Sequence, residues 1–147
     1  MRAGRRLALL LPIFLLILPV RVLEVQTGGR SCAILLGKAE VEVGYIHSVS
    51  LTEVRDFYVV NGSGIYAVEQ EWQQFDAGQP ISYDEIRDGF FVKKLSLYIG
   101  TSLEYGFTTI NNATVYVNGH FVTKAGDKLR FDVEFLPLAV LIAKRCS

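Results

Sequence analysis

One histidine and two acidic residues in the first half of the chain are of the types that bind a metal ion or a cationic group. His47 is followed nine positions later by Asp56, and Glu69 lies in the next apolar stretch. One imidazole and two carboxylates brought together could coordinate a divalent metal or hold a cationic group of a substrate. The same set could instead be structural, because burying any of these groups without a partner would cost several kcal/mol. We favour the structural interpretation and keep the metal site as the alternative.

Neighbouring strands would have to bring these residues together. Val41–Val49 and Val54–Val60 are expected to form a hairpin, and a two-residue turn at Gly62-Ser63 leads into a third strand. Side chains alternate between the two faces of a strand, so the register decides which residues meet. We expect the register that pairs apolar residues, because a slip of one residue would scatter them. It sets His47 opposite Asp56, Asp56 opposite Glu69, Val49 opposite Val54, Tyr45 opposite Tyr58, and Val43 opposite Val60.

Other catalytic chemistry has little support in the sequence. Ser48 is adjacent to His47, so on a strand the two side chains point to opposite faces. No Gly-x-Ser-x-Gly elbow, Cys-x-x-Cys pair, phosphate-binding loop or dinucleotide-binding motif occurs. His120 follows an Asn-Gly turn and is expected to be an exposed loop residue. We therefore expect a non-enzymatic protein without a cofactor, apart from the metal that the row of His47, Asp56 and Glu69 would allow.

Trp72 and the loop after it form a second place where a ligand could bind. Residues 75–89 are the longest stretch without clear alternation, and they include Gly78 and Pro80. Loops of that length in compact domains tend to be functional. We expect Trp72 to pack in the core, with a platform for a ligand as the alternative. Within this stretch only Tyr83–Asp88 could hold a helical turn.

The two cysteines lie far apart in the sequence. Cys32 is near the start of the expected domain, and Cys146 is next to the last residue. In an oxidising compartment a disulfide between them would hold the two ends of the domain together. Two separate thiols are the alternative, because the sequence does not show whether the partners meet.

The rest of the chain has the pattern of short antiparallel strands. Residues 129–135 alternate strictly, and Asn118-Gly119 between two alternating runs is a strong hairpin signal. Leu95–Ile99 is expected to be another strand, and Leu138–Ala143 the last one. Strands at this spacing favour an all-β fold, either an antiparallel β-sandwich or a small barrel, as a single domain over residues 24–147.

Residues 1–23 have the composition of a targeting segment. Three arginines precede the apolar run Leu7–Val20, and Arg21 ends it. This arrangement is typical of a signal peptide or an N-terminal membrane anchor, and it places the following domain outside the cytoplasm. We favour a retained anchor, because no small-x-small cleavage site follows the run. The chain carries 15 basic and 15 acidic residues, so its net charge does not indicate a nucleic-acid partner.

The stretch from Tyr45 to Pro80 resembles a family catalogued as the domain of unknown function 1850. The similarity rests on the triplet His47-Ser48-Val49, on Asp56, and on Ala77, Gly78 and Pro80, and it extends over about Glu24 to Phe135. Departures from the family pattern are Ser50 for an acid, Glu53 for proline, Asp56 for glutamate and Asp76 for glycine. The resemblance implies a small exported or membrane-tethered protein, often encoded beside TRAP transporters of the TAXI class. It implies subunits of such a transporter as partners, and no chemistry for His47 or Asp56.

Overall fold

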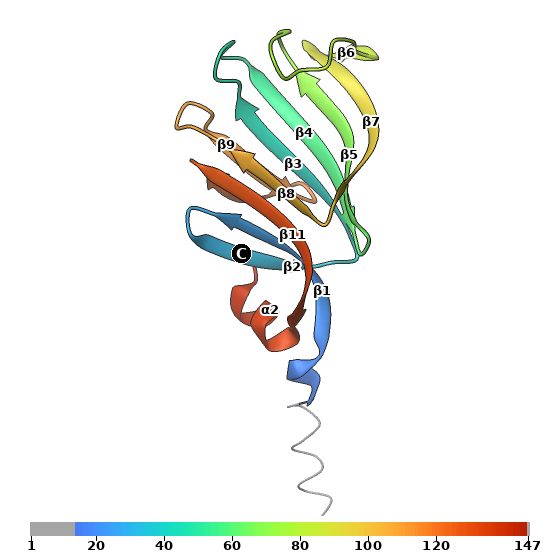
Figure 1. The fold of residues 1–147 in the computed structure, drawn as a ribbon, viewed down its shortest axis with the longest axis vertical. Helices are drawn as coiled ribbons and strands as arrows, with labels where there is room; N and C mark the ends of the chain where they lie inside the picture. Colours follow the sequence, from blue (N-terminus) through green and yellow to red (C-terminus); the bar gives the residue numbers. More distant parts are fainter. Residues whose placement is uncertain (1–13, 147) are drawn as a thin grey trace, which may run out of the picture.

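A computed structural model describes residues 14–146 of the chain. Its strands form two antiparallel sheets. The smaller sheet has four strands and the larger has seven (Figure 1). In spatial order the smaller sheet contains β2 (Arg30–Leu35), β1 (Pro19–Thr27), β11 (Lys128–Pro137) and β8 (Ser102–Gly106). The larger contains β10 (His120–Ala125), β9 (Ala113–Val117), β3 (Lys38–Ile46), β4 (Glu53–Asn61), β5 (Gly64–Trp72), β7 (Phe90–Gly100) and β6 (Glu85–Arg87). Of the two expected architectures, the all-β sandwich is confirmed.

The core lies between the two sheets. Alternate residues of β1 and β11, among them Leu23, Val25 and Phe131, face alternate residues of the larger sheet such as Val43 and Val60. This alternation is what the sequence pattern requires of strands with one buried face. The hairpin at Asn118-Gly119 is also confirmed, because both residues have the positive φ angles of the tight turn that Asn-Gly favours, 52° and 76°.

The domain starts earlier than the sequence indicates. β1 begins at Pro19 and is paired on both sides, with β2 and β11, so Pro19–Leu23 belong to the sheet. Val22 and Leu23 are fully buried. The expected targeting segment therefore reaches no further than Leu18, and its first 13 residues lie outside the described part. Residues 14–17 are helical. Within residues 14–146, no helix has the length and apolar character that crossing a membrane requires.

Two local predictions were wrong. Leu138–Ala143 is not a strand but part of helix α2 (Leu138–Lys144), which buries Leu141 against Val22 and Ala33. A short continuous apolar run fits a buried helix as well as a strand, so its periodicity could not decide. Tyr83–Asp88 holds no helical turn; Glu85–Arg87 instead pair with the first residues of β7 as β6.

A disulfide joins Cys32 on β2 to Cys146 after α2, at a Cα–Cα distance of 4.9 Å. The backbone amide of Cys146 donates a hydrogen bond to the carbonyl of Ala33, and Arg145 bridges to the same strand. Lys144, the last residue of α2, forms an ion pair of 2.9 Å with buried Glu24 of β1. These contacts fix α2 to the outer face of the smaller sheet.

Candidate functional site

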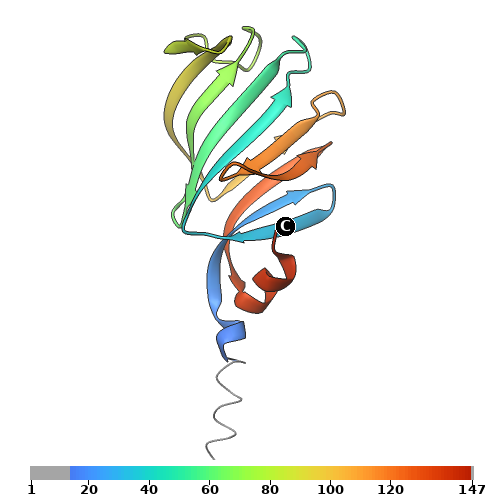
Figure 2. The ribbon, with the colours of Figure 1, turned by 180° about the vertical axis from the view of Figure 1, so that it is seen from behind.

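Three loops meet at the end of the sandwich opposite α2 (Figures 1 and 2). They are residues 47–52 between β3 and β4, residues 73–84 between β5 and β6, and residues 107–112 between β8 and β9. Hydrogen bonds of 2.8 and 2.7 Å join Ile46 to Asn111, and the ring of His47 contacts the carbonyl of Ala77 at 3.1 Å. Loops from distant parts of the sequence are therefore held together as one surface.

His47 is the link between the first two loops. Its Nε2 donates to the carbonyl of Ala77, and its Nδ1 accepts from the backbone amides of Val49 and Ser50 at 3.4 Å. The Ser50 hydroxyl lies 3.1 Å from the same Nδ1, and the Asp76 carboxylate lies 3.6 Å from it. The imidazole thus has partners on both nitrogens and acts as a clamp between loops.

The expected pairing of His47 with Asp56 does not form. β3 ends at Ile46 and β4 begins at Glu53, so His47 lies in a six-residue loop rather than on the strand, and Val43 is opposite Asp56. The observed register differs from the expected one by an even number of residues. Such a shift keeps every side chain on its expected face, so apolar alternation could not distinguish the two registers.

His47→Ala is expected to loosen the loops without disturbing the sheets. The change removes the contacts to Ala77 and to the amides of the 47–52 loop, at a cost of about 1 kcal/mol for partly exposed groups. Hydrogen exchange should accelerate in residues 47–52 and 75–80 and stay unchanged in β1 and β11. His120→Ala is the matched control, because His120 is exposed. Equal exchange in the two variants would contradict the clamp.

Trp72 anchors the 73–84 loop from below. It is fully buried. The centroid of its ring lies 5.7 Å from that of Phe75, in an edge-on arrangement, and 6.0 Å from that of Phe91. Phe75 and Tyr83 both pack on Phe91, so the aromatic cluster holds the loop at each end. Trp72 therefore belongs to the packing beneath the loop rather than to its exposed face.

Gly78 and Pro80 lie in the exposed turn of the same loop. Gly78 has φ of 94°, a conformation that side chains disfavour, and the Gln79 amide closes the turn onto the Asp76 carbonyl. The same turn presents the Ala77 carbonyl to His47. The glycine is therefore needed for the backbone geometry of the loop clamp.

Asp56 lies inside the sandwich among hydroxyl groups rather than beside the histidine. Its carboxylate accepts hydrogen bonds of 2.7 Å from Gln70 and from Tyr105, and the Tyr105 hydroxyl is also bonded to that of Tyr58. Burial raises the pKa of Asp56, while these hydrogen bonds act in the opposite direction. Burial, followed by the nearby Asp56 charge, also raises the pKa values of Tyr45, Tyr58 and Tyr105. No ion pair to Asp56 occurs among the described residues.

The raised pKa of Asp56 predicts the sign of a pH effect. A group with a raised pKa in the folded state contributes stability that is complete below its unfolded value of 3.8 and is lost as the pH rises through the folded value. Asp56→Asn should remove this dependence, so its stability relative to the wild type should increase from acidic to neutral pH. Urea unfolding across that range measures the difference. Asp56→Ala also lacks the titrating carboxyl and should show the same pH trend, offset by a cost of about 1–3 kcal/mol because Tyr105 and Gln70 lose their acceptor.

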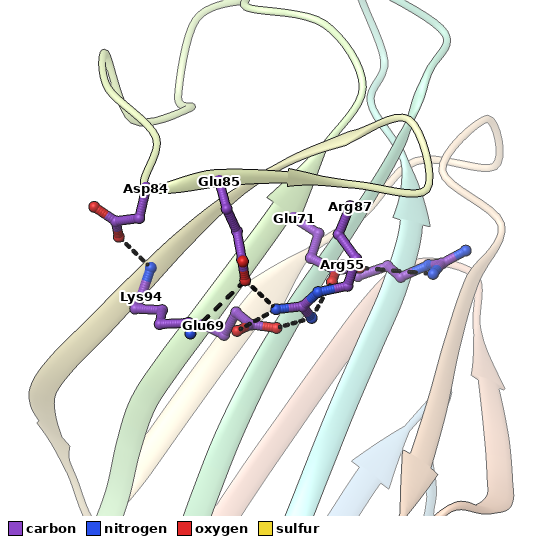
Figure 3. Close-up of polar contacts among 7 residues, drawn as sticks. All are labelled: Arg55, Glu69, Glu71, Asp84, Glu85, Arg87 and Lys94. Atoms are coloured by element: carbon purple, nitrogen blue, oxygen red, sulfur yellow. Dashed lines mark hydrogen bonds and ion pairs between the residues drawn. The ribbon is translucent and has the colours of Figure 1, made fainter.

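Glu69 lies on the other side of the larger sheet. A bulge between Phe57 and Tyr58 shifts the register of β5, which sets Gln70 opposite Asp56 and Glu69 opposite Phe57. Glu69 forms an ion pair of 3.0 Å with Arg87 of β6 on the outer face (Figure 3). Among the described residues, no group of three or more histidine, cysteine or acidic side chains is arranged to hold a metal ion. The row that the metal hypothesis required is therefore not assembled.

Arg87 belongs to a charged network that holds β6 in place. It also pairs with Glu71 at 3.2 Å and with Glu85, and Arg55 reaches Glu71 at 3.6 Å (Figure 3). Burial raises the pKa of Glu71, while the two arginines lower it. Because every residue of β6 is exposed, these ion pairs and the pairing with β7 hold the strand, and with it the second end of the 73–84 loop.

The loops expose apolar side chains that the sequence analysis did not single out as a site. Val49 is 72% exposed, Leu51 65%, Ile81 98% and Ile110 55%. Ser48 is exposed beside Val49. The signal that could have identified them is the presence of aliphatic residues inside Gly-, Pro- and Asn-containing loops, where polar residues are the rule. Aliphatic side chains are therefore exposed on each of the three loops that meet at this end of the sandwich.

Leu51 also has an unusual backbone conformation. Its φ angle is 55°, in the left-handed region, and its amide is bonded to the His47 carbonyl at 3.0 Å. A branched residue in this region costs about 1–3 kcal/mol. The exposed side chain gains no burial in return, so packing within the domain does not account for a leucine here. A contact outside the domain would account for it.

Comparison with known proteins identifies the family. A search of curated proteins and a search of solved structures found no match. The sequence profile of the domain of unknown function DUF1850 matches residues 41–123, which is more than half of the chain and includes His47, Asp56 and the 73–84 loop. The chain therefore belongs to the DUF1850 family.

Proposed function

We propose that this protein is a non-enzymatic binding module whose three-loop end engages a partner protein. The observation that carries the proposal is the exposure of Val49, Leu51, Ile81 and Ile110 on loops that hydrogen bonds hold together. Burial of apolar surface is the main favourable contribution in most protein–protein association, and a rigid surface reduces the entropy lost on binding. The strained Leu51 supports the same conclusion.

The partner we propose is a subunit of a TRAP transporter of the TAXI class. This assignment rests on the resemblance of the chain to proteins encoded beside such transporters, and it concerns the partner rather than the surface. The proposed location is the outer face of the cytoplasmic membrane, with residues 1–18 as a retained anchor. Three basic residues before the apolar run, and the disulfide of Cys32 and Cys146, support an exported domain.

Variants of the exposed loop residues test the proposal. The full-length chain would be co-expressed with a TAXI-type binding protein and its membrane subunit, and the complex quantified after affinity purification. Val49→Asp and Ile81→Asp should weaken association by about tenfold or more, because each places a charge in a desolvated contact. Leu97→Asp is the matched control, since Leu97 is a similarly exposed aliphatic residue on β7, away from the loops. Equal association of all three variants would contradict the proposed surface.

Leu51→Gly separates binding from stability. Glycine adopts positive φ without strain, so the variant should unfold at the same or a higher urea concentration than the wild type. Its association with the partner should nevertheless fall, because the exposed leucine side chain is gone. A variant that is both less stable and fully able to bind would show that Leu51 serves the fold alone.

A further inference from the structure

The end of the sandwich opposite the three loops carries an apolar groove. The groove lies between the edge strands β2 and β10 and helix α2, and its volume is about 820 Å³. Its lining is mainly aliphatic and aromatic: Ile34, Leu35, Phe121, Leu138, Leu141 and Ile142. Three of these side chains are largely exposed, Leu35 and Ile142 at 62% and Phe121 at 50%. The volume is in the range of pockets that hold small ligands, which are also mostly apolar.

The groove adjoins the point where the apolar N-terminal segment enters the domain. The amide of Leu138, the first residue of α2, donates a hydrogen bond of 3.0 Å to the carbonyl of Leu18. Residues 14–17, directly before Leu18, expose large apolar side chains. Only Leu18 separates this helical turn from β1, so a membrane that held the N-terminal segment would be close to α2. In Figures 1 and 2 the turn is next to α2 at the same end of the molecule.

The charged residue that lines the groove is an arginine. Arg145 and His120 line it together with the apolar residues, and no acidic side chain does. Arg145 forms no ion pair within residues 14–146. A guanidinium group is suited to bidentate hydrogen bonding with a phosphate. The groove therefore has an apolar interior and a basic group free to meet an anionic head group.

We propose that this groove binds a phospholipid of the anchoring membrane, with an acyl chain along α2 and the phosphate at Arg145. The inference rests on the membrane anchoring proposed above and is independent of the partner at the loops. The other occupants that an apolar groove could take are a second copy of the chain or another protein. The position beside residues 14–18 favours the lipid, because Leu138, which lines the groove, is hydrogen-bonded to Leu18 at the end of the expected anchor.

Photolabelling of the full-length protein in lipid vesicles tests the proposal. The protein would be reconstituted into phosphatidylcholine vesicles that contain a trace of phosphatidylglycerol with a photoreactive acyl chain, and labelled peptides mapped by mass spectrometry. Label is expected on β2, β10 and α2. Leu35→Asp and Ile142→Asp should reduce that label by about tenfold or more. Ile81→Asp, a fully exposed aliphatic position at the loop end, should leave it unchanged.

Two further measurements distinguish a failure of the lipid site from a failure of the membrane anchor. Flotation with the vesicles reports the anchor alone and should be the same for the wild type and all variants. Arg145→Gln should reduce label from phosphatidylglycerol more than label from a matched phosphatidylcholine probe. Label confined to residues before Pro19, equal label in the groove variants, or cross-links from the groove to a second protein chain would overturn the proposal. Loss of flotation by the wild type would instead refute the anchoring on which it rests.

Discussion

Cys146→Ser is expected to lower the free energy of unfolding by about 4–5 kcal/mol. The bridge to Cys32 spans 114 residues of sequence, and a cross-link of that span removes a large part of the conformational entropy of the unfolded chain. For a domain of this size the melting temperature should fall on the order of 10–20 °C. Calorimetry of the full-length protein in detergent, compared with the wild type, measures the change.

Reductant provides the control for this prediction. It should lower the melting temperature of the wild type to that of Cys146→Ser and should have no effect on the variant in which both cysteines are serine. Thiol titration of the unfolded, unreduced wild type should find no free thiol. Two free thiols, or a melting temperature that reductant does not change, would contradict the role assigned to the bridge.

Trp72→Ala is expected to cost about 3–5 kcal/mol, the range for removing a large aromatic side chain from a core. Trp72 is fully buried and supports Phe75 and Phe91, so the variant should also release the 73–84 loop. Urea unfolding followed by circular dichroism measures the stability, and hydrogen exchange in residues 75–84 measures the loop.

Trp72→Phe is the matched comparison. Phenylalanine keeps an aromatic contact with Phe75. The indole Nε1 has no hydrogen-bond partner among the described residues, so removing it leaves no acceptor without its donor. The phenylalanine variant should therefore lose clearly less stability than the alanine variant and keep the loop protected. Equal losses would indicate that Nε1 has a partner and that packing is not the main contribution of Trp72.

Local turn chemistry and alternation predicted much of the fold. Asn118-Gly119 and Gly62-Ser63 identified two hairpins, because tight turns restrict which residues can occupy them. Alternation placed Val43, Tyr45, Asp56, Tyr58 and Val60 on one face of the larger sheet, as the observed register also has them. These features depend on a few neighbouring residues, which is why one sequence is enough to infer them.

The candidate site could be predicted only in part. The family resemblance placed His47, Gly78 and Pro80 in one stretch of the chain, and the structure brings them to the same end. It did not indicate that the loop after β3 has six residues or that β5 carries a bulge at Val68, opposite Phe57 and Tyr58. Both depend on backbone hydrogen bonds, such as that between Leu51 and His47, which apolar alternation does not encode. Tyr105 and Gln70 are the hydrogen-bond partners of Asp56. Their positions depend on these registers and on how the two sheets pack, so the sequence did not indicate them.

In-cell photocrosslinking tests the central claim most directly, namely that the three-loop end is the surface that binds a transporter subunit. A photoreactive amino acid would replace Val49, Ile81 or Ile110 in turn, with Leu97 as the control position on β7. We expect adducts with a TAXI-type transporter subunit from the loop positions and none from Leu97. Adducts from Leu97 without adducts from the loops would contradict it.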